Sequence, residues 1–242
     1  MSNVWWITRR ELTHYLRSPL GYVIITIALI IDGLLFNAVA VGPSQRLSSL
    51  VLQDFFWCAS GTTMAASIFI AMRLIAEERQ TGTLTLLATS PLADWQIVLG
   101  KFLGAVVLLA VMNALTIYMP LLLMLNGKIS AGHLVAGYLG LMLIGATAVS
   151  LGLLCSALAP NQLIAAIAAT GVILVFILLW ILARLTTPPL EDLLAYLSIH
   201  DKHFRPFQKG LVSIADVVFY VSLSYVALLA ATRALEARRW RG

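Results

Sequence analysis

The uncharged stretch from residue 129 to residue 183 constrains this chain more than any other feature. It holds no Asp, Glu, Lys or Arg, and its one turn signal is Ala159-Pro160-Asn161-Gln162. A membrane-spanning helix needs about 20 apolar residues, so the stretch is long enough for two. The backbone in lipid must satisfy its own hydrogen bonds, and a continuous rather than alternating apolar pattern indicates helices. We therefore predict spans at His133–Ala159 and Leu163–Ala183.

The composition of the whole chain is that of an integral membrane protein. Of 242 residues, 60% are hydrophobic and 11% are charged, whereas soluble domains carry about 25% charged residues. Further spans are predicted at Leu20–Val41, at Phe55–Ile75, from Pro91 to Leu125 with a kink at Pro120, and at Leu211–Thr232. The sequence thus predicts an all-α membrane protein in which residues 1–242 form one domain of six transmembrane helices.

Residues 3–18 precede the first span and have the pattern of an amphipathic helix. Its apolar arc and its polar flank consist of Val4, Trp5, Leu12, Tyr15 and Leu16, and of Arg9, Arg10 and Arg17. Ser18-Pro19 ends the pattern. We predict an interfacial helix that lies on the membrane surface. The alternative is a cytoplasmic extension of the first span.

The basic residues orient the spans, because cytoplasmic loops carry an excess of Lys and Arg. Six spans put both termini on one side. That side has Arg9, Arg10, Arg17, Arg73, Arg79, Lys101, Arg233, Arg238, Arg239 and Arg241, and the other side has Arg46, Lys128, Arg184, Lys202, Arg205 and Lys209. We expect both termini in the cytoplasm and the polar loop 186–210, with a short helix at Leu190–Leu197, outside. The basic residues form no stripe, which argues against a nucleic-acid partner.

A polar insert separates the second span from the third. It begins with Glu77, Glu78 and Arg79, and Gly82 marks a turn. Ser90 can cap a helix that Pro91 opens, because proline at the first helical position gives up only an unused donor. Asp94 then falls in the first turn of that helix.

Between these signals, the apolar residues Leu84, Leu86 and Leu87 predict a short helix around Thr83–Thr89. A linker between two spans needs no such helix, but a surface for a cytoplasmic partner does. The alternative for the charged residues at 77–79 is an ordinary solvated span end.

This insert resembles the loop between the second and third membrane helices of type-2 ABC transporter permeases. The matching residues are Glu78, Arg79, Gly82, Thr83, Leu84, Ser90, Pro91, Leu92, Gly100, Lys101 and Phe102, whereas Thr85 stands where an acid is common in the family. The end of the chain resembles gliding-motility-type permeases of the same class. That resemblance rests on His203, Phe204, Phe207, Gly210, Asp216, Tyr220, Leu235, Glu236, Arg238, Arg239 and Trp240, with departures at Arg205 and Pro206.

The resemblance implies the membrane subunit of an ATP-driven exporter in a bacterial inner membrane. Residues 76–97 would form its coupling loop, in which Glu77, Glu78, Arg79, Gly82, Thr83, Leu84, Leu87, Ser90 and Pro91 serve the contact with the ATPase. The implied partners are two ATPase subunits, which carry ATP and Mg, a second permease copy or a related permease, and membrane lipids. The resemblance leaves open whether an extracytoplasmic accessory subunit is a further partner.

The chain itself lacks the residues that ATP hydrolysis requires. The Gly-Lys pair Gly100-Lys101 is followed by Phe102 and has Trp95 where a phosphate-binding loop needs glycine, and the pair Gly127-Lys128 is followed by Ile129 instead of Ser or Thr. We therefore predict no enzyme activity and no cofactor in this chain. His200 and His203, at helical spacing, are a candidate metal pair, but a solvated or interfacial role is the more common one and no metal site is predicted.

The sequence is also compatible with two other classes of membrane protein. One is a scaffold or binding subunit without a transport path. The other is an ion-coupled secondary carrier, which usually shows internal repeats and broken spans. Copurification of an ATPase would separate the predicted permease from both.

Asp32 is the one acid deep inside a predicted span. A charged side chain there costs at least about 2.5–3.5 kcal/mol unless it faces protein or water. In one interpretation Asp32, with Asn113, lies in a translocation path or subunit interface. In the other, Asp32 is protonated or paired with an amide, such as Asn37 or Asn113, and only locks helices together. The sequence favours neither.

Overall fold

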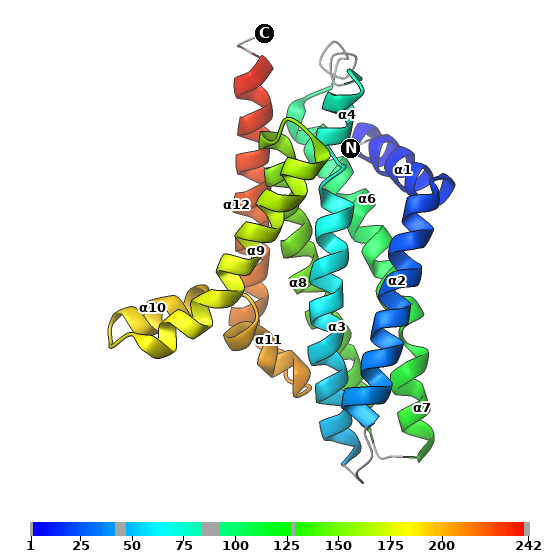
Figure 1. The fold of residues 1–242 in the computed structure, drawn as a ribbon, viewed down its shortest axis with the longest axis vertical. Coiled ribbons are helices and arrows are strands. Elements are labelled where there is room, and N and C mark those ends of the chain that lie inside the picture. The colour runs from blue at the N-terminus through cyan, green and yellow to red at the C-terminus, as the bar shows by residue number, and fades with distance from the viewer. Residues whose placement is uncertain (1, 42–46, 84–91, 127–128, 240–242) are drawn as a thin grey trace.

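The computed structural model of the protein describes residues 2–41, 47–83, 92–126 and 129–239. Within these residues every regular element is a helix (Figure 1). In chain order they are α1 (Ser2–Arg17), α2 (Pro19–Leu35), the π-helical η1 (Phe36–Val41), α3 (Ser48–Ala71), α4 (Ala76–Gln80), α6 (Asp94–Leu115), α7 (Tyr118–Asn126), α8 (Ala131–Leu158), α9 (Gln162–Leu185), α10 (Leu190–Leu197), α11 (Asp201–Gln208) and α12 (Ile214–Arg239).

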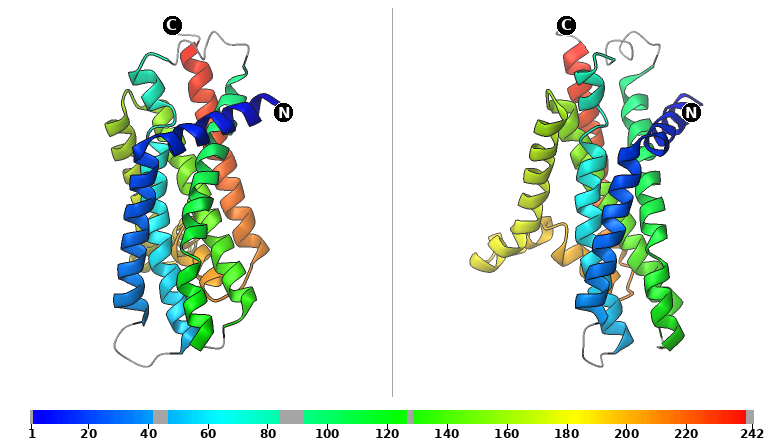
Figure 2. Two further views of the ribbon diagram at one scale, coloured as in Figure 1. Left: turned by 90° about the vertical axis from the view of Figure 1, so that its right-hand side faces the viewer. Right: turned by 45° about the vertical axis from the view of Figure 1, so that its right-hand side comes forward.

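Six helical segments in the described part of the chain are long and apolar enough to cross a membrane. They are Pro19–Val39, Ser48–Gln80, Asp94–Met124, Ala131–Leu158, Gln162–Leu185 and Ile214–Ala237. The prediction of six spans and an N-terminal helix is confirmed, although the second span begins at Ser48 rather than Phe55. α1 crosses one end of the bundle, and the last turns of α12 lie at that same end (Figures 1 and 2).

Helices α3 and α8 form the core of the bundle. Buried residues make up 72% of the apolar window of α8 and 61% of that of α3, but only 17% of those of α2 and α9. α8 packs against α3, α6, α9, α11 and α12. The remaining spans therefore surround two central helices, and α2 and α9 offer most of their surface to whatever lies outside this chain.

Glycines of α8 allow this close packing. A methyl group on Gly137 would lie 2.1 Å from Cζ of Phe56, and one on Gly152 would lie 2.5 Å from Cβ of Ala71. Because lipid provides no hydrophobic driving force between helices, small residues stabilise a bundle by letting backbones approach. These glycines therefore let α8 pack closely against α3.

The third span differs from its prediction at its start. Leu92 and Ala93 are not helical and α6 begins at Asp94, so the predicted continuous helix from Pro91 is wrong. The N–H of Ala93 donates to Oε1 of Gln96 at 3.3 Å, which holds the first turn. Asp94 does lie in that first turn, as predicted.

The predicted kink near Pro120 is confirmed. α6 ends at Leu115 and α7 resumes at Tyr118. The intervening break starts at Thr116, four residues before Pro120, where the proline ring would clash with the helical carbonyl. A disturbance one turn upstream of a proline is what its geometry requires.

The polar loop 186–210 contains two helices where one was predicted. α10 has the predicted bounds, Leu190–Leu197, but α11 was missed because it is short and polar and contains Pro206. Its buried Phe204 and Phe207 lie against α8, where a methyl group on Gly140 would be 2.6 Å from Cβ of Phe207. Long-range packing, rather than local propensity, stabilises this helix.

Single cysteines can test the orientation of the bundle, in a variant whose Cys58 and Cys155 are replaced. Thr81, which follows α4, and Glu191 of α10 are exposed. α4 lies at one end of the bundle, whereas α10 projects from its side, away from that end (Figure 1). Ser198 is fully buried and unsuitable. We expect Glu191→Cys to react with a membrane-impermeant maleimide in intact cells, and Thr81→Cys to react only after the cytoplasmic face is opened. Reaction of both from one face would contradict the six-span topology.

Candidate functional site: the charged junction of α1, α4 and α6

A break between α3 and α4 redirects the chain where the polar insert begins. Residues 72–75 form a turn between the two helices. The hydroxyl of Ser156, on α8, accepts hydrogen bonds from the N–H groups of Ile75 (3.1 Å) and Ala76 (2.9 Å) and donates to the carbonyl of Met72 (3.0 Å). Because Ser156 is fully buried, it supplies partners that water cannot reach. Nothing in the sequence marked Ser156 for this role.

The charged residues at 77–79 are engaged with the protein, unlike those of a solvated span end. Arg73 donates to Glu77 through two bonds, Nε to Oε2 at 2.7 Å and Nη2 to Oε1 at 2.6 Å. Arg79 donates to the carbonyls of Ala157, at 2.7 Å, and Ala159. Cations are favoured at the carbonyl end of a helix, so Arg79 attaches α4 to the end of α8.

The turn predicted at Gly82 is confirmed. Its φ is 75°, in the left-handed region that glycine adopts without strain. Gly82 and Thr83 are exposed directly after α4. Leu84, Leu87, Ser90 and Pro91, and with them most of the predicted Thr83–Thr89 helix, lie outside the described residues.

Four charged side chains from three helices meet beside α4. Lys101 of α6 is only 1% exposed. Its Nζ lies 2.7 Å from Oε1 of Glu11 on α1 and 2.9 Å from Oε1 of Glu78 on α4. Nη2 of Arg10 lies 2.7 Å from the same oxygen of Glu78 and 3.2 Å from Oε1 of Glu11. Two acids and two bases balance, so the junction holds no uncompensated buried charge.

The protonation of Glu11 reflects this balance. Burial alone would raise the pKa of its carboxyl group. The charges and hydrogen bonds of Lys101, and then of Arg10, outweigh burial and hold the pKa below its usual value. Glu11 is therefore ionised at neutral pH, and the ion pairs that join α1 to α6 are present.

Two glycines of α6 allow α1 to pack closely against the bundle. A methyl group on Gly100 would lie 2.7 Å from Cβ of Ile7, and one on Gly104 would lie 2.8 Å from Cβ of Glu11. Oγ1 of Thr8 donates to the carbonyl of Gly100 at 3.1 Å. Glycines four residues apart form a flat track for a neighbouring helix, and this track holds Glu11 over Lys101.

α1 is a separate helix and not an extension of the first span. Ser18 caps α2 by accepting the N–H of Leu20 at 3.3 Å, and Pro19 takes the first helical position. The buried hydroxyl of Tyr15 donates to the carbonyl of Ile70 on α3 at 2.9 Å. The cytoplasmic-extension alternative is therefore wrong.

A polar cavity of about 650 Å³ opens at the junction, with Arg10, Glu11, Arg73, Glu77, Glu78 and Lys101 among its lining residues. The structure thus brings Glu77 and Glu78 together with three residues that sequence reasoning did not assign to a site, Arg10, Glu11 and Lys101. One signal was available: a lysine next to a long apolar run needs an acid, and Glu11 is the one acid of residues 3–18.

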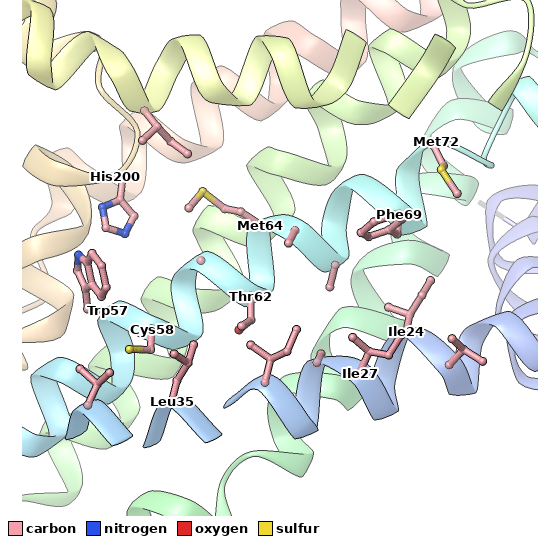
Figure 3. Close-up of a pocket in the computed structure, with 18 of the residues that line it drawn as sticks. Ile24, Ile27, Leu35, Trp57, Cys58, Thr62, Met64, Phe69, Met72 and His200 are labelled. Atoms are coloured by element: carbon pink, nitrogen blue, oxygen red, sulfur yellow. The ribbon is translucent and has the colours of Figure 1, made fainter. Parts of the chain in front are cut away.

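A second concave surface lies along the side of the bundle. An apolar groove of about 670 Å³ runs between α2 and α3 and reaches Ile177 of α9. Figure 3 shows side chains of α2 and α3 along it, with Trp57 and His200 at one end and Met72 at the other. Its walls come mainly from α2, one of the least buried spans, and from the buried core helix α3.

Asp32 and Asn113 each accept a hydrogen bond from α3, but from different threonines. Oδ1 of Asp32, which is 3% exposed, accepts from Thr62 at 2.6 Å. Oδ1 of Asn113 accepts from Thr63 at 3.1 Å. The suggestion that Asp32 pairs with an amide is wrong, since its partner is a hydroxyl. Thr62 also lines the apolar groove, so both the path and the helix-locking interpretations of Asp32 stay predictions.

The two histidines of the loop 186–210 have different partners. Ring nitrogens of His203 lie 2.6 Å from Oδ1 of Asp216 and 2.8 Å from the carbonyl of Tyr196. Nε2 of His200 lies 2.7 Å from Oγ of Ser60. In this arrangement His203 ties α11 to α12, and His200 ties the α10–α11 connection to α3.

These features define a multi-span membrane subunit in which the charged segment after α3 is joined by ion pairs to the N-terminal helix α1. Residues 2–180 match the family of the ABC-2 type transporter. The chain belongs to this family and is a transmembrane ABC permease subunit, of a kind that is itself non-catalytic. No curated protein matches the chain. The match includes the junction and most of the groove but ends before α10, and it decides against an ion-coupled secondary carrier.

Proposed function

We propose that this permease subunit couples ATP hydrolysis by a partner ATPase to the export of a substrate across a bacterial inner membrane, with both termini in the cytoplasm. The observation that carries the proposal is the charged junction. Glu78 lies at the end of the second span, and its partners Lys101 and Arg10 belong to the third span and to α1. A displacement of the insert would therefore act on three helices together.

The rest of the coupling segment supports the same proposal. α4 is attached to α8 through Arg79 and Ser156, so it has contacts to the core as well as to α1 and α6. In the proposed complex, Leu84 and Leu87 of the short helix would occupy a groove of the ATPase, with Ser90 and Pro91 returning the chain to α6. The proposed complex contains two ATPase subunits, and these would carry ATP and Mg.

The translocation path would form between two permease subunits, this chain and a second copy or a relative. α2 and α9 have few buried residues of their own, and the groove between α2 and α3 is apolar. A partner subunit that covers this face would bury it and enclose a path. Asp32 would lie one layer behind that face, through its contact with Thr62.

The outer loop supports assignment to the gliding-motility-type subgroup. The residues that carry this resemblance pack together in the fold: His203 pairs with Asp216, the hydroxyl of Tyr220 donates to the carbonyl of Ile199 at 2.6 Å, and Phe204 and Phe207 are fully buried. They maintain the loop structure, and the exposed surface of α10 is where an extracytoplasmic accessory subunit would bind.

Leu87→Asp in the coupling segment tests the proposal. The permease is co-expressed with the ABC ATPase encoded in the same genome and purified through a tag on the permease. We expect the variant to insert in the membrane at the wild-type level, to lose most of the copurified ATPase, and to lose ATP hydrolysis by the complex. An aspartate in place of an apolar anchor removes much of the affinity of a helix for a groove.

Leu190→Asp is the matched control, since Leu190 is 56% exposed on α10, away from α4. It should leave ATPase binding unchanged. Reversal of Glu78 is a poor test, because it would gather three cations in the junction and disturb the fold itself. If Leu87→Asp retains the ATPase and its hydrolysis rate, the coupling role of this segment is disproved.

A further inference from the structure

The exposed side of α1 has a continuous basic stripe. Its residues recur at spacings of three and four and line a shallow cavity of about 410 Å³: Trp6, Arg9, Arg10, Thr13, His14 and Arg17. Residues three and four apart share a helix face. The one acid of α1, Glu11, lies on the opposite face and is buried against Lys101. Arg10 is paired with Glu11 and Glu78 of the junction, whereas the stripe itself contains no acidic residue.

The face of α1 next to the basic stripe is apolar, and it determines how deeply the stripe lies in the membrane. Trp5 is 65% exposed and Leu16 is 46% exposed, and with Leu12 they occupy the helix flank beside Arg9. An exposed apolar flank that leads directly into a membrane span is expected to lie in lipid. α2 begins at Pro19, one residue after the cap that follows α1. The basic stripe is thus placed where the hydrocarbon core meets the headgroups.

We propose that the basic stripe of α1 binds the headgroup phosphate of an anionic phospholipid. Guanidinium groups suit a phosphate because their planar donors form two parallel bonds to its oxygens. The carbon ring of Trp6 and the apolar flank fit the adjoining glycerol and acyl chains. The guanidinium of Arg9 also lies 5.9 Å from the ring centre of Trp6, which keeps cation and aromatic ring on one surface.

Arg10 connects this site to the charged junction. Its side chain is 53% exposed and lines both the stripe cavity and the junction cavity, while its Nη2 contacts Glu11 and Glu78. A phosphate at the stripe would share Arg10 with those two carboxylates. Arg10 is therefore left unchanged in the test, because its replacement would alter two sites at once.

Binding is measured on the purified permease by native mass spectrometry, titrating phosphatidylglycerol or phosphatidylcholine into detergent micelles. The variant is Arg9→Gln with Arg17→Gln. We expect the wild type to prefer phosphatidylglycerol and the variant to bind it roughly tenfold more weakly, since each basic residue near a headgroup contributes a several-fold preference. The control is Arg205→Gln with Arg233→Gln, which removes the same charge from side chains that are 54% and 73% exposed elsewhere. It should bind like the wild type.

Several results would overturn the proposal. Equal binding of the two lipids by the wild type, or an equal loss in the variant and the control, would show net charge or nonspecific adsorption instead of a site. Displacement of the lipid by millimolar glycerol phosphate would indicate a site for soluble phosphates. The circular dichroism and melting temperature of each variant should match the wild type, and no ATPase is present, so the result does not depend on the coupling proposal.

Discussion

Replacement of Lys101 by Met is expected to destabilise the protein by about 3–5 kcal/mol, because breaking a buried ion pair leaves an uncompensated charge in the interior. Two carboxylates, of Glu11 and Glu78, would share the single guanidinium of Arg10. Methionine fills a similar volume, so the change isolates the charge from the packing. The free energy of unfolding is measured in detergent micelles by denaturant titration of the helical signal.

The double variant Lys101→Met with Glu11→Gln provides the control. It removes one charge of each sign, which leaves Arg10 paired with Glu78 and restores neutrality. We expect it to recover most of the stability that Lys101→Met loses. If the single and double variants are equally unstable, the lysine contributes through packing and not through its charge.

The pH dependence gives a second, independent readout of the same junction. The pKa of Glu11 is lowered in the folded wild type, so its contribution to stability is complete above the pKa of the unfolded chain, about 4.3, and is lost as pH falls through the lower folded value. Without Lys101, burial becomes the dominant influence and should raise that pKa. The variant should then gain stability on acidification relative to the wild type, and a parallel decline of both would contradict this account.

Gly104→Leu is expected to displace α1 from α6. The first added carbon would lie 2.8 Å from Cβ of Glu11, closer than van der Waals contact allows, and leucine adds three further carbons at this contact. Overpacking of this kind costs about 1–3 kcal/mol, and the displacement would also part Glu11 from Lys101. Hydrogen exchange in α1 should increase strongly, and trypsin should cleave after Arg9 and Arg10.

Gly171→Leu is the matched control for this substitution. Gly171 lies in α9, and a methyl group added there meets nothing within 4 Å. This variant should leave the hydrogen exchange of α1 and the stability unchanged. Wild-type protection of α1 in Gly104→Leu would mean that the glycine track does not hold the helix.

Much of the fold follows from local features of the sequence. The uncharged run at 129–183 determines two spans, because lipid admits only helices with satisfied backbones. Ser18-Pro19 separates α1 from α2, and Gly82 ends α4, because these residues have local conformational preferences that need no partner. α11 was missed because its stability comes from Phe204 and Phe207 packed against another helix.

For the candidate site, too, some features follow from local sequence and others only from the tertiary structure. The sequence by itself determined that a charged segment with a glycine turn follows the second span, since charge and turn signals can be read from neighbours along the chain. Only the tertiary structure decided that Glu78 pairs with Lys101 and Arg10, and that Ser156 completes the broken helix beside it. Those contacts join residues far apart in sequence. Their partners are selected by which helices pack together, and here glycines at 100 and 104 bring α1 close enough for one lysine to be buried between two acids.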